Sequence, residues 1–136
     1  MRILVDTPVW SLALRRRVSP DTPAVTELRA LIREGRVAII GPIRQEVLSG
    51  VRERQALERL RDHLRAFTDQ LLQADDFERA AEHFNACRAA GLQGSNTDFL
   101  LCAVSERHSL PILTTDEDFR RFAAVLPIAL HSPRPM

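Results

Sequence analysis

Four acidic residues carry the chemistry that this sequence could perform, and each stands beside a segment expected to form a strand or a helix. If the fold gathers them, their carboxylates repel one another, and some would take up a proton unless a cation neutralises them. Oxygen ligands with no His or Cys nearby favour Mg²⁺ or Mn²⁺ over Zn²⁺. Such a metal, held with open positions, binds phosphate oxygens and activates water, which is the chemistry of phosphodiester hydrolysis. The four residues are Asp6, Glu46, Asp98 and Asp116.

Three short apolar runs predict the strands that would position these acids. The runs span 3–5, 37–40 and 111–113, and segments with helical spacing lie between them. Apolar strands alternating with helices predict a three-layer α/β/α sandwich with a central parallel sheet. Ligands of such sheets bind beyond the carboxyl ends of the strands. Because Asp6 and Asp116 follow two of the runs closely, we expect the acids to meet at that edge.

Helices are predicted from the spacing of apolar residues and from the Gly and Pro residues at their ends. The segment 98–107 is apolar on nearly all sides, so we expect it in the centre of the domain. The stretch 68–74 is ambiguous between a short strand and a turn, and 127–130 is a candidate edge strand. The expected helices are 8–14, 23–34, 42–48, 52–67, 76–90, 98–107 and a short one around Phe119 and Phe122.

Each acid also has a purely structural interpretation. Asp6 could cap the first helix, and Asp98 could be the third residue of a capping box begun by Ser95. Asp116 could favour a helix dipole, and Glu46 could be an ordinary solvated residue. Capping alone does not explain an acid at every one of these ends, because Ser or Thr serves as well.

Length and composition favour a single domain over residues 1–130, followed by a loose, Pro-rich tail over 131–136. Hydrophobic residues make up 45% of the chain, enough for a proper core, and the net charge of +1 excludes a strongly basic nucleic-acid binder. All 19 residues counted as Lys or Arg are Arg. The absence of Lys excludes Schiff-base and lysine general-base chemistry.

The cysteine content and the hydropathy pattern favour a cytoplasmic protein. Cys87 and Cys102 have no metal-ligand spacing and are expected to be buried free thiols, which fits a reducing compartment. The sequence shows no secretion signal and no stretch of 18 apolar residues, so we expect no membrane association.

The motifs DTPVW, GPIRQEVLSG, SNTDFLLCAV and PILTTDEDF, in this order, resemble those of PIN-domain ribonucleases. Among these, the chain is most similar to VapC-type toxins of type II toxin–antitoxin pairs. The resemblance covers essentially the whole chain and implies a PIN-like fold with the acidic quartet as its catalytic centre. It implies that Asp6 and Asp98 are the main Mg²⁺ (or Mn²⁺) ligands. Glu46 and Asp116 would hold metal-bound waters or a second ion.

The resemblance also implies two helper residues and shows two departures from the family pattern. Thr7 matches the small residue after the first acid, and Thr97 is a helper beside Asp98. Pro8 stands where the family often has Ser, Thr or Asn, so a helper hydroxyl is missing there. The DEDF segment offers both Asp116 and Asp118 as the fourth acid, and Asp116 is preferred because it is nearer the strand end.

RNA as the substrate, a VapB-like antitoxin as the partner and a homodimer are implied by the same resemblance. Arg15, Arg16 and Arg17 follow the acidic edge and could contact RNA phosphates, although a solvated run of charges is an equal alternative. The apolar positions of the helices 23–34 and 52–67 suggest more apolar surface than one small sheet can cover.

Three other classes of protein remain to be compared with this interpretation. A haloacid-dehalogenase-like phosphatase and a phosphoacceptor receiver domain also begin with a strand ending in Asp, but both require a Lys that this chain lacks. The phosphatase also needs a second Asp where this chain has Pro8. A non-catalytic PIN-like binding module would be expected to have lost part of the quartet, which is intact here.

Overall fold

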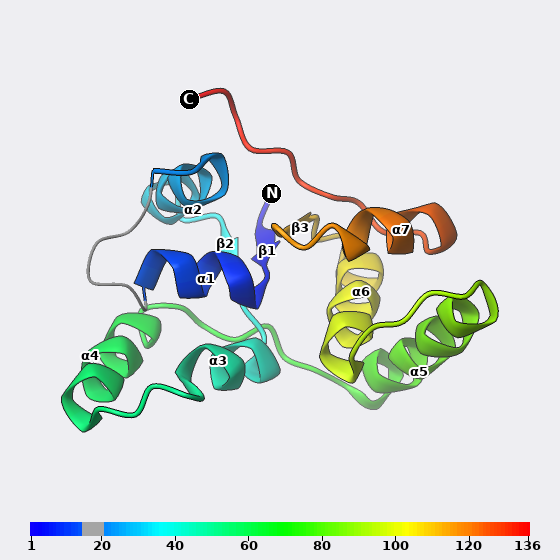
Figure 1. The fold of residues 1–136 in the computed structure, drawn as a ribbon, viewed down its shortest axis with the longest axis horizontal. Coiled ribbons are helices and arrows are strands. Elements are labelled where there is room, and N and C mark those ends of the chain that lie inside the picture. The colour runs from blue at the N-terminus through cyan, green and yellow to red at the C-terminus, as the bar shows by residue number, and fades with distance from the viewer. Residues whose placement is uncertain (15–20) are drawn as a thin grey trace.

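The computed structural model describes residues 1–14 and 21–136. Within these ranges the chain forms a three-stranded parallel sheet flanked by seven helices, so the predicted α/β architecture is confirmed (Figure 1). The strands are β1 (Ile3–Val5), β2 (Val37–Ala38) and β3 (Ile112–Leu113). Their order in the sheet is β2-β1-β3, with Ile3 paired to Val37 and Val5 paired to Leu113.

The strand order places a switch point at the carboxyl end of β1. β2 and β3 lie on opposite sides of β1, and both run parallel to it. Connections leaving β1 and β2 therefore diverge, and the carboxyl end of β1 is where ligands of such sheets bind. Asp6, the residue after β1, stands at this point.

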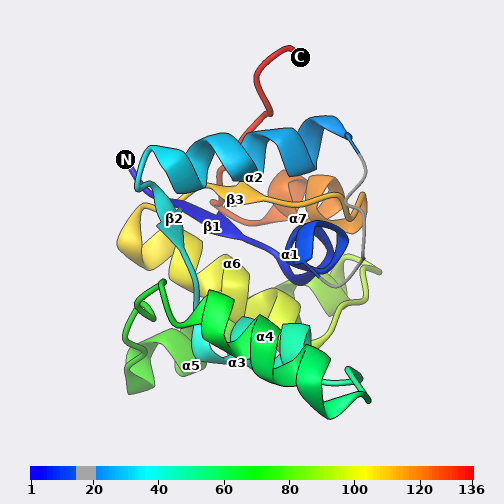
Figure 2. The ribbon, with the colours of Figure 1, turned by 90° about the vertical axis from the view of Figure 1, so that its left-hand side faces the viewer.

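The helices cover both faces of the sheet. Figure 2 shows α2 along one face and α6 along the other; α5 packs on α6, whereas α3 and α4 lie below α1 in Figure 1. The first helix begins one residue after Asp6, so the strand end and the helix start share this corner of the fold. The helices are α1 (Thr7–Leu14), α2 (Pro23–Arg33), α3 (Gly41–Leu48), α4 (Arg54–Leu64), α5 (Ala74–Ala89), α6 (Asn96–His108) and α7 (Asp118–Val125).

Helix α6 is the central helix that its composition predicts. All its residues from Phe99 to Ser105 are buried. Two ionic clusters fix it to α5: Asp76 contacts Arg107 and His108, and Glu106 contacts Arg79 and His83. The hydrogen bond from Arg79 holds the pKa of Glu106 below its usual range. These ion pairs anchor the C-terminal end of α6, and the buried stretch from Phe99 to Ser105 fixes the helix that begins beside Asp98.

Trp10 is a core residue beside the end of β1. It is fully buried, its Nε1 donates to the Val5 carbonyl at 3.1 Å, and its ring meets Phe67 edge to face at 5.1 Å. Trp10 thereby ties the end of β1 to α1, next to Asp6.

Cys87 and Cys102 are buried free thiols, as expected.

Single bridges extend the sheet at both edges. Ile39 bridges Asp69 and Ile112 bridges Leu130, both in parallel orientation. The ambiguous stretch 68–74 and the candidate edge strand 127–130 thus each contribute one bridge instead of a full strand. Short pairings of this kind leave little regular edge exposed.

The apolar faces of α2 and α4 are mostly covered within the chain. Val25, Leu28 and Leu31 are fully buried, Leu57 is half-buried, and Ile32 remains 37% exposed. Most of the two stripes is covered within the chain, that of α2 by α1 and β2 and that of α4 by α3, while Ile32 and Leu57 keep part of their surface, so the homodimer stays a prediction. None of the helices in residues 1–14 and 21–136 is long and apolar enough to cross a membrane.

The segment 131–136 contains no helix or strand, yet two of its side chains contact α2. Glu27, only 3% exposed, accepts hydrogen bonds from the ring of His131 and from Arg134 Nε at 2.9 Å. Burial opposes the ionisation of Glu27, but these bonds outweigh it and lower its pKa to about 2. Arg134 also reaches Glu34 at 2.7 Å, so the segment is held against α2 at these residues.

Candidate acidic site at the carboxyl edge of the sheet

Asp6 is a buried carboxylate fixed by two hydrogen bonds at the end of β1. It is 5% exposed; Oδ1 accepts from the backbone N–H of Thr7 and Oδ2 from the hydroxyl of Thr114, both at 2.8 Å. Burial, and to a smaller extent the charges of Asp98 and Asp116, raise its pKa from 3.8 to about 6 against the lowering effect of the two hydrogen bonds. A carboxylate accepts at about four lone-pair positions, so Asp6 retains capacity to bind a cation.

Thr114 is a site residue that the sequence analysis did not single out. Its hydroxyl donates to Asp6 and accepts from the backbone N–H of Asp116 at 3.0 Å. One side chain thus connects the end of β1 to the loop after β3 and sets the distance between two of the acids. The signal was present as a hydroxyl directly after the third apolar run, but only the strand pairing places it opposite Asp6.

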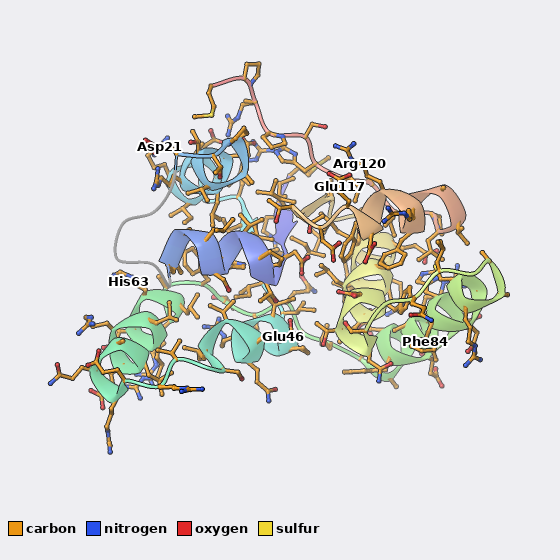
Figure 3. The ribbon with its side chains drawn as sticks, in the orientation of Figure 1. Asp21, Glu46, His63, Phe84, Glu117 and Arg120 are labelled. Atoms are coloured by element: carbon orange, nitrogen blue, oxygen red, sulfur yellow. The ribbon has the colours of Figure 1, made fainter. Side chains whose placement is uncertain are left out.

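Glu46 reaches the site through Thr7. Glu46 is exposed on α3, where Figure 3 labels it, and its Oε1 accepts from the Thr7 hydroxyl at 2.7 Å. Thr7 therefore supports two acids, Asp6 through its backbone N–H and Glu46 through its side chain. This contact fixes the Glu46 carboxylate beside the start of α1.

Asp98 combines a structural and an electrostatic role. With Ser95 it forms a capping box: Asp98 N–H donates to Ser95 Oγ at 3.1 Å, and Ser95 N–H donates to Asp98 Oδ2 at 2.9 Å. The structural interpretation of Asp98 is thus confirmed. Burial also raises its pKa, and the charges of Asp116 and Glu46 raise it further. Asp98 therefore faces the other acids while it caps α6.

The structure separates the two candidates for the fourth acid. Asp116 is half-buried and is close enough to raise the pKa values of both Asp6 and Asp98. Asp118 is exposed on α7 and is paired with Arg121 at 2.6 Å. Asp118 N–H also donates to Asp116 Oδ1 at 2.9 Å, which orients the Asp116 carboxylate.

The donor set fits a hydrated Mg²⁺ or Mn²⁺ better than a closed metal cage. Across residues 1–14 and 21–136, no three His, Cys, Asp or Glu side chains converge closely enough to enclose an ion. Mg²⁺ keeps several waters and needs only one or two direct carboxylates. Asp6 and Asp98 lie within electrostatic reach of each other, and their mutual repulsion is what a cation would relieve.

Of the other residues predicted for the site, only Thr97 lies in the described part of the chain. Thr97 is half-buried in the first turn of α6, directly before Asp98. Arg15, Arg16 and Arg17 lie outside the described residues. The geometry of the site is therefore built by Asp6, Glu46, Asp98 and Asp116, with Thr7 and Thr114 between them.

The acids gather at the carboxyl end of the sheet, where ligands of open parallel α/β sheets bind. The family model described as the PIN domain matches residues 3–125, so the chain belongs to the PIN-domain family. PIN domains are generally nucleases, that is, hydrolases of nucleic acids. No curated protein sequence matches the chain.

Two solved structures share the fold at low sequence identity. The crystal structure of FitAcB from Neisseria gonorrhoeae is 21% identical, with a TM-score of 0.73 over 96% of this chain and 97% of that chain. VapBC2 from Rickettsia felis, bound to a DNA fragment from their promoter, is 18% identical, with a TM-score of 0.78 over 98% of this chain and 100% of that chain. The likeness extends over nearly the whole length of all three chains.

Proposed function

We propose that the chain is a Mg²⁺- or Mn²⁺-dependent endoribonuclease and the toxin of a VapBC-like toxin–antitoxin pair. The observation that carries the proposal is the meeting of Asp6, Asp98 and Asp116 at the switch point, where burial and mutual repulsion raise the pKa of Asp6 to about 6. A bound cation would remove this repulsion, and strongly shifted carboxylates cluster at functional sites. We propose RNA as the substrate of the protein and the cytoplasm as its compartment.

Asp6 and Asp98 are the direct ligands in this proposal, and Glu46 and Asp116 hold metal-bound waters or a second ion. A bound metal would polarise the phosphate and lower the pKa of its water. Thr114 and Thr7 keep the carboxylates at fixed distances by the hydrogen bonds described above. Thr97 supports the start of α6 beside Asp98, and Arg15, Arg16 and Arg17 are proposed phosphate contacts.

Cleavage of a mixed RNA pool by the purified protein tests the proposal. We expect cleavage with Mg²⁺ or Mn²⁺, none with a chelator, and defined ends on mapping. A matched pair of variants serves as the control: Asp116→Asn should slow cleavage by roughly 10- to 100-fold, the usual loss when a group that orients metal-bound water is removed. Asp118→Asn, two residues away and paired with Arg121, should cleave like the wild type.

Two outcomes would contradict the proposal. Undiminished cleavage in chelator would exclude the metal mechanism. Binding of RNA without cleavage, under every metal condition, would make the chain a non-catalytic PIN-like module instead.

A VapB-like antitoxin and a second copy of the chain are the proposed partners. The solved structures of similar fold carry the names of paired proteins, FitAcB and VapBC2, which supports the antitoxin. We expect the product of an adjacent small reading frame to co-purify with the chain and to inhibit it, and light scattering to give a homodimer. A monomer at micromolar concentration that ignores this product would refute the claim.

A further inference from the structure

A cavity of about 290 Å³ opens beside the acidic site. It lies between the loop after β3, the start of α7 and the C-terminal segment, and Thr114 and Asp116 line it as well as the acidic site. Its volume is close to the lower end of small-ligand sites, ~300 Å³, which suits one nucleotide rather than a longer segment. A substrate strand whose phosphate lies at the acids would therefore have a neighbouring nucleotide within reach of this cavity.

The outer wall of the cavity is held in place by contacts away from the acids. Leu130, His131 and Ser132 form this wall. His131 N–H donates to the Ile112 carbonyl at 2.7 Å, and its ring contacts the buried Glu27. Arg134 also donates to the Glu27 carboxylate. This wall contains no helix or strand, but backbone and side-chain hydrogen bonds hold it in place.

Glu117 and Arg120 give the cavity a paired acceptor and donor. Their side chains are mostly exposed at the surface of the cavity lining and form an ion pair at 3.3 Å, and Figure 3 labels them next to each other near the start of α7. Asp116 and Glu117 add two negative charges to the lining, and Arg120 adds one positive charge. This balance disfavours a second phosphate and favours an uncharged base with hydrogen-bond donors.

The geometry points to a guanine-binding pocket for the nucleotide next to the cleaved phosphate, an inference that rests on the proposed function. Arg pairs with guanine O6 and N7, and guanine offers N–H donors on its Watson–Crick edge to a carboxylate. Single-stranded RNA exposes both edges to a protein. Glu117 and Arg120 thus set the base specificity. Cleavage takes place at the acidic site, on the strand that these two residues position.

Nucleotide binding tests the pocket without any cleavage. The metal-free full chain, labelled at its Ile and Leu methyl groups, is titrated with GMP, AMP, CMP and UMP. We expect GMP to shift the methyl signals of Ile112 and Leu130, which line the cavity, more than the other nucleotides do. Because all four carry the same phosphate, the difference reports the base. Glu117→Gln and Arg120→Ala should each weaken GMP binding at least about tenfold, as losing one paired base contact does.

Arg121→Ala is the matched control. Arg121 is the next residue on α7 and is paired with Asp118, but it does not line the cavity, so GMP binding should not change. Equal shifts for all four nucleotides, or no shift at Ile112 and Leu130, would overturn the inference.

End mapping separates this inference from the proposed function. With metal, wild-type cuts should cluster beside guanine, and Glu117→Gln should lose this preference while still cutting. Cleavage without base preference would overturn the pocket and leave the nuclease intact. GMP binding without any cleavage would overturn the nuclease and support the pocket as a nucleotide site.

Discussion

Asp6→Asn is expected to stop RNA cleavage and, in the absence of metal, to make the protein more stable at neutral pH. Loss of a direct metal ligand should lower the cleavage rate by roughly 100-fold or more, the scale on which loss of a single transition-state-stabilising group slows an enzyme. The opposite effect on stability follows from the environment of Asp6. It is 5% exposed and faces Asp98 and Asp116, so its charge is a cost to the metal-free fold.

The pH dependence of this cost follows from the shift in pKa. The pKa of Asp6 is raised from 3.8 to about 6 in the folded protein, so the folded state binds the proton more tightly than the unfolded state. The contribution of Asp6 to stability is therefore fully present below about pH 4 and is lost as the pH rises through about 6. Asn carries no charge, so the variant should gain on the wild type over that window.

The size of the gain is a balance of two effects. A pKa raised from 3.8 to about 6 corresponds to roughly 3 kcal/mol. Asn would lose about 1 kcal/mol of this gain by weakening one of the two hydrogen bonds from Thr7 and Thr114. A net gain on the order of 1–2 kcal/mol should raise the melting temperature by several degrees at pH 7.

Thermal unfolding of both proteins in chelator, from pH 4 to pH 8, measures this difference. Because the other acids are common to both proteins, their titrations largely cancel. If the stability of Asp6→Asn relative to wild type were lower at pH 8 than at pH 4, the charged form of Asp6 would be stabilised by the metal-free fold. This result would contradict its role as a metal ligand.

The acids at strand ends were predictable because a strand end is a local feature. Asp6 follows an apolar run, and the parallel order of the runs is enough to bring it near Asp116. The same reasoning placed α6 in the centre, since its apolar surface can be satisfied only there.

Contacts between distant segments could not be predicted, because they depend on register and side-chain direction. The Thr114 hydroxyl meets Asp6 only once Val5 is paired with Leu113. Glu27 looked like an ordinary polar residue of an amphipathic helix, yet it is buried by a C-terminal segment more than 100 residues away in the sequence. The sequence could not decide whether Asp98 is a helix cap or a member of the acidic site, because in the structure it is both. It caps α6 and also lies within electrostatic reach of Asp116 and Glu46.

Asp98→Asn and Ser95→Ala together separate these two roles of Asp98. The Asn side-chain oxygen can still accept from Ser95 N–H, so the cap should largely persist, with about 0.3–1 kcal/mol lost from the charge–dipole interaction. Removing a charge that faces Asp116 and Glu46 should offset this loss, so stability in chelator should change little. Ser95→Ala removes the other half of the box and should cost about 1 kcal/mol, with the carboxylate retained.

Metal-induced stabilisation then distinguishes ligand from cap. Wild type should gain melting temperature on adding millimolar Mg²⁺ or Mn²⁺, because a ligand that binds only the folded state stabilises it by mass action. Ser95→Ala should start lower but show nearly the same gain, because its carboxylates are intact. Asp98→Asn should start near wild type, lose most of the gain and lose cleavage with it. Equal gains in wild type and Asp98→Asn would mean that Asp98 caps α6 and binds no metal, and the direct ligand beside Asp6 would then have to be Asp116.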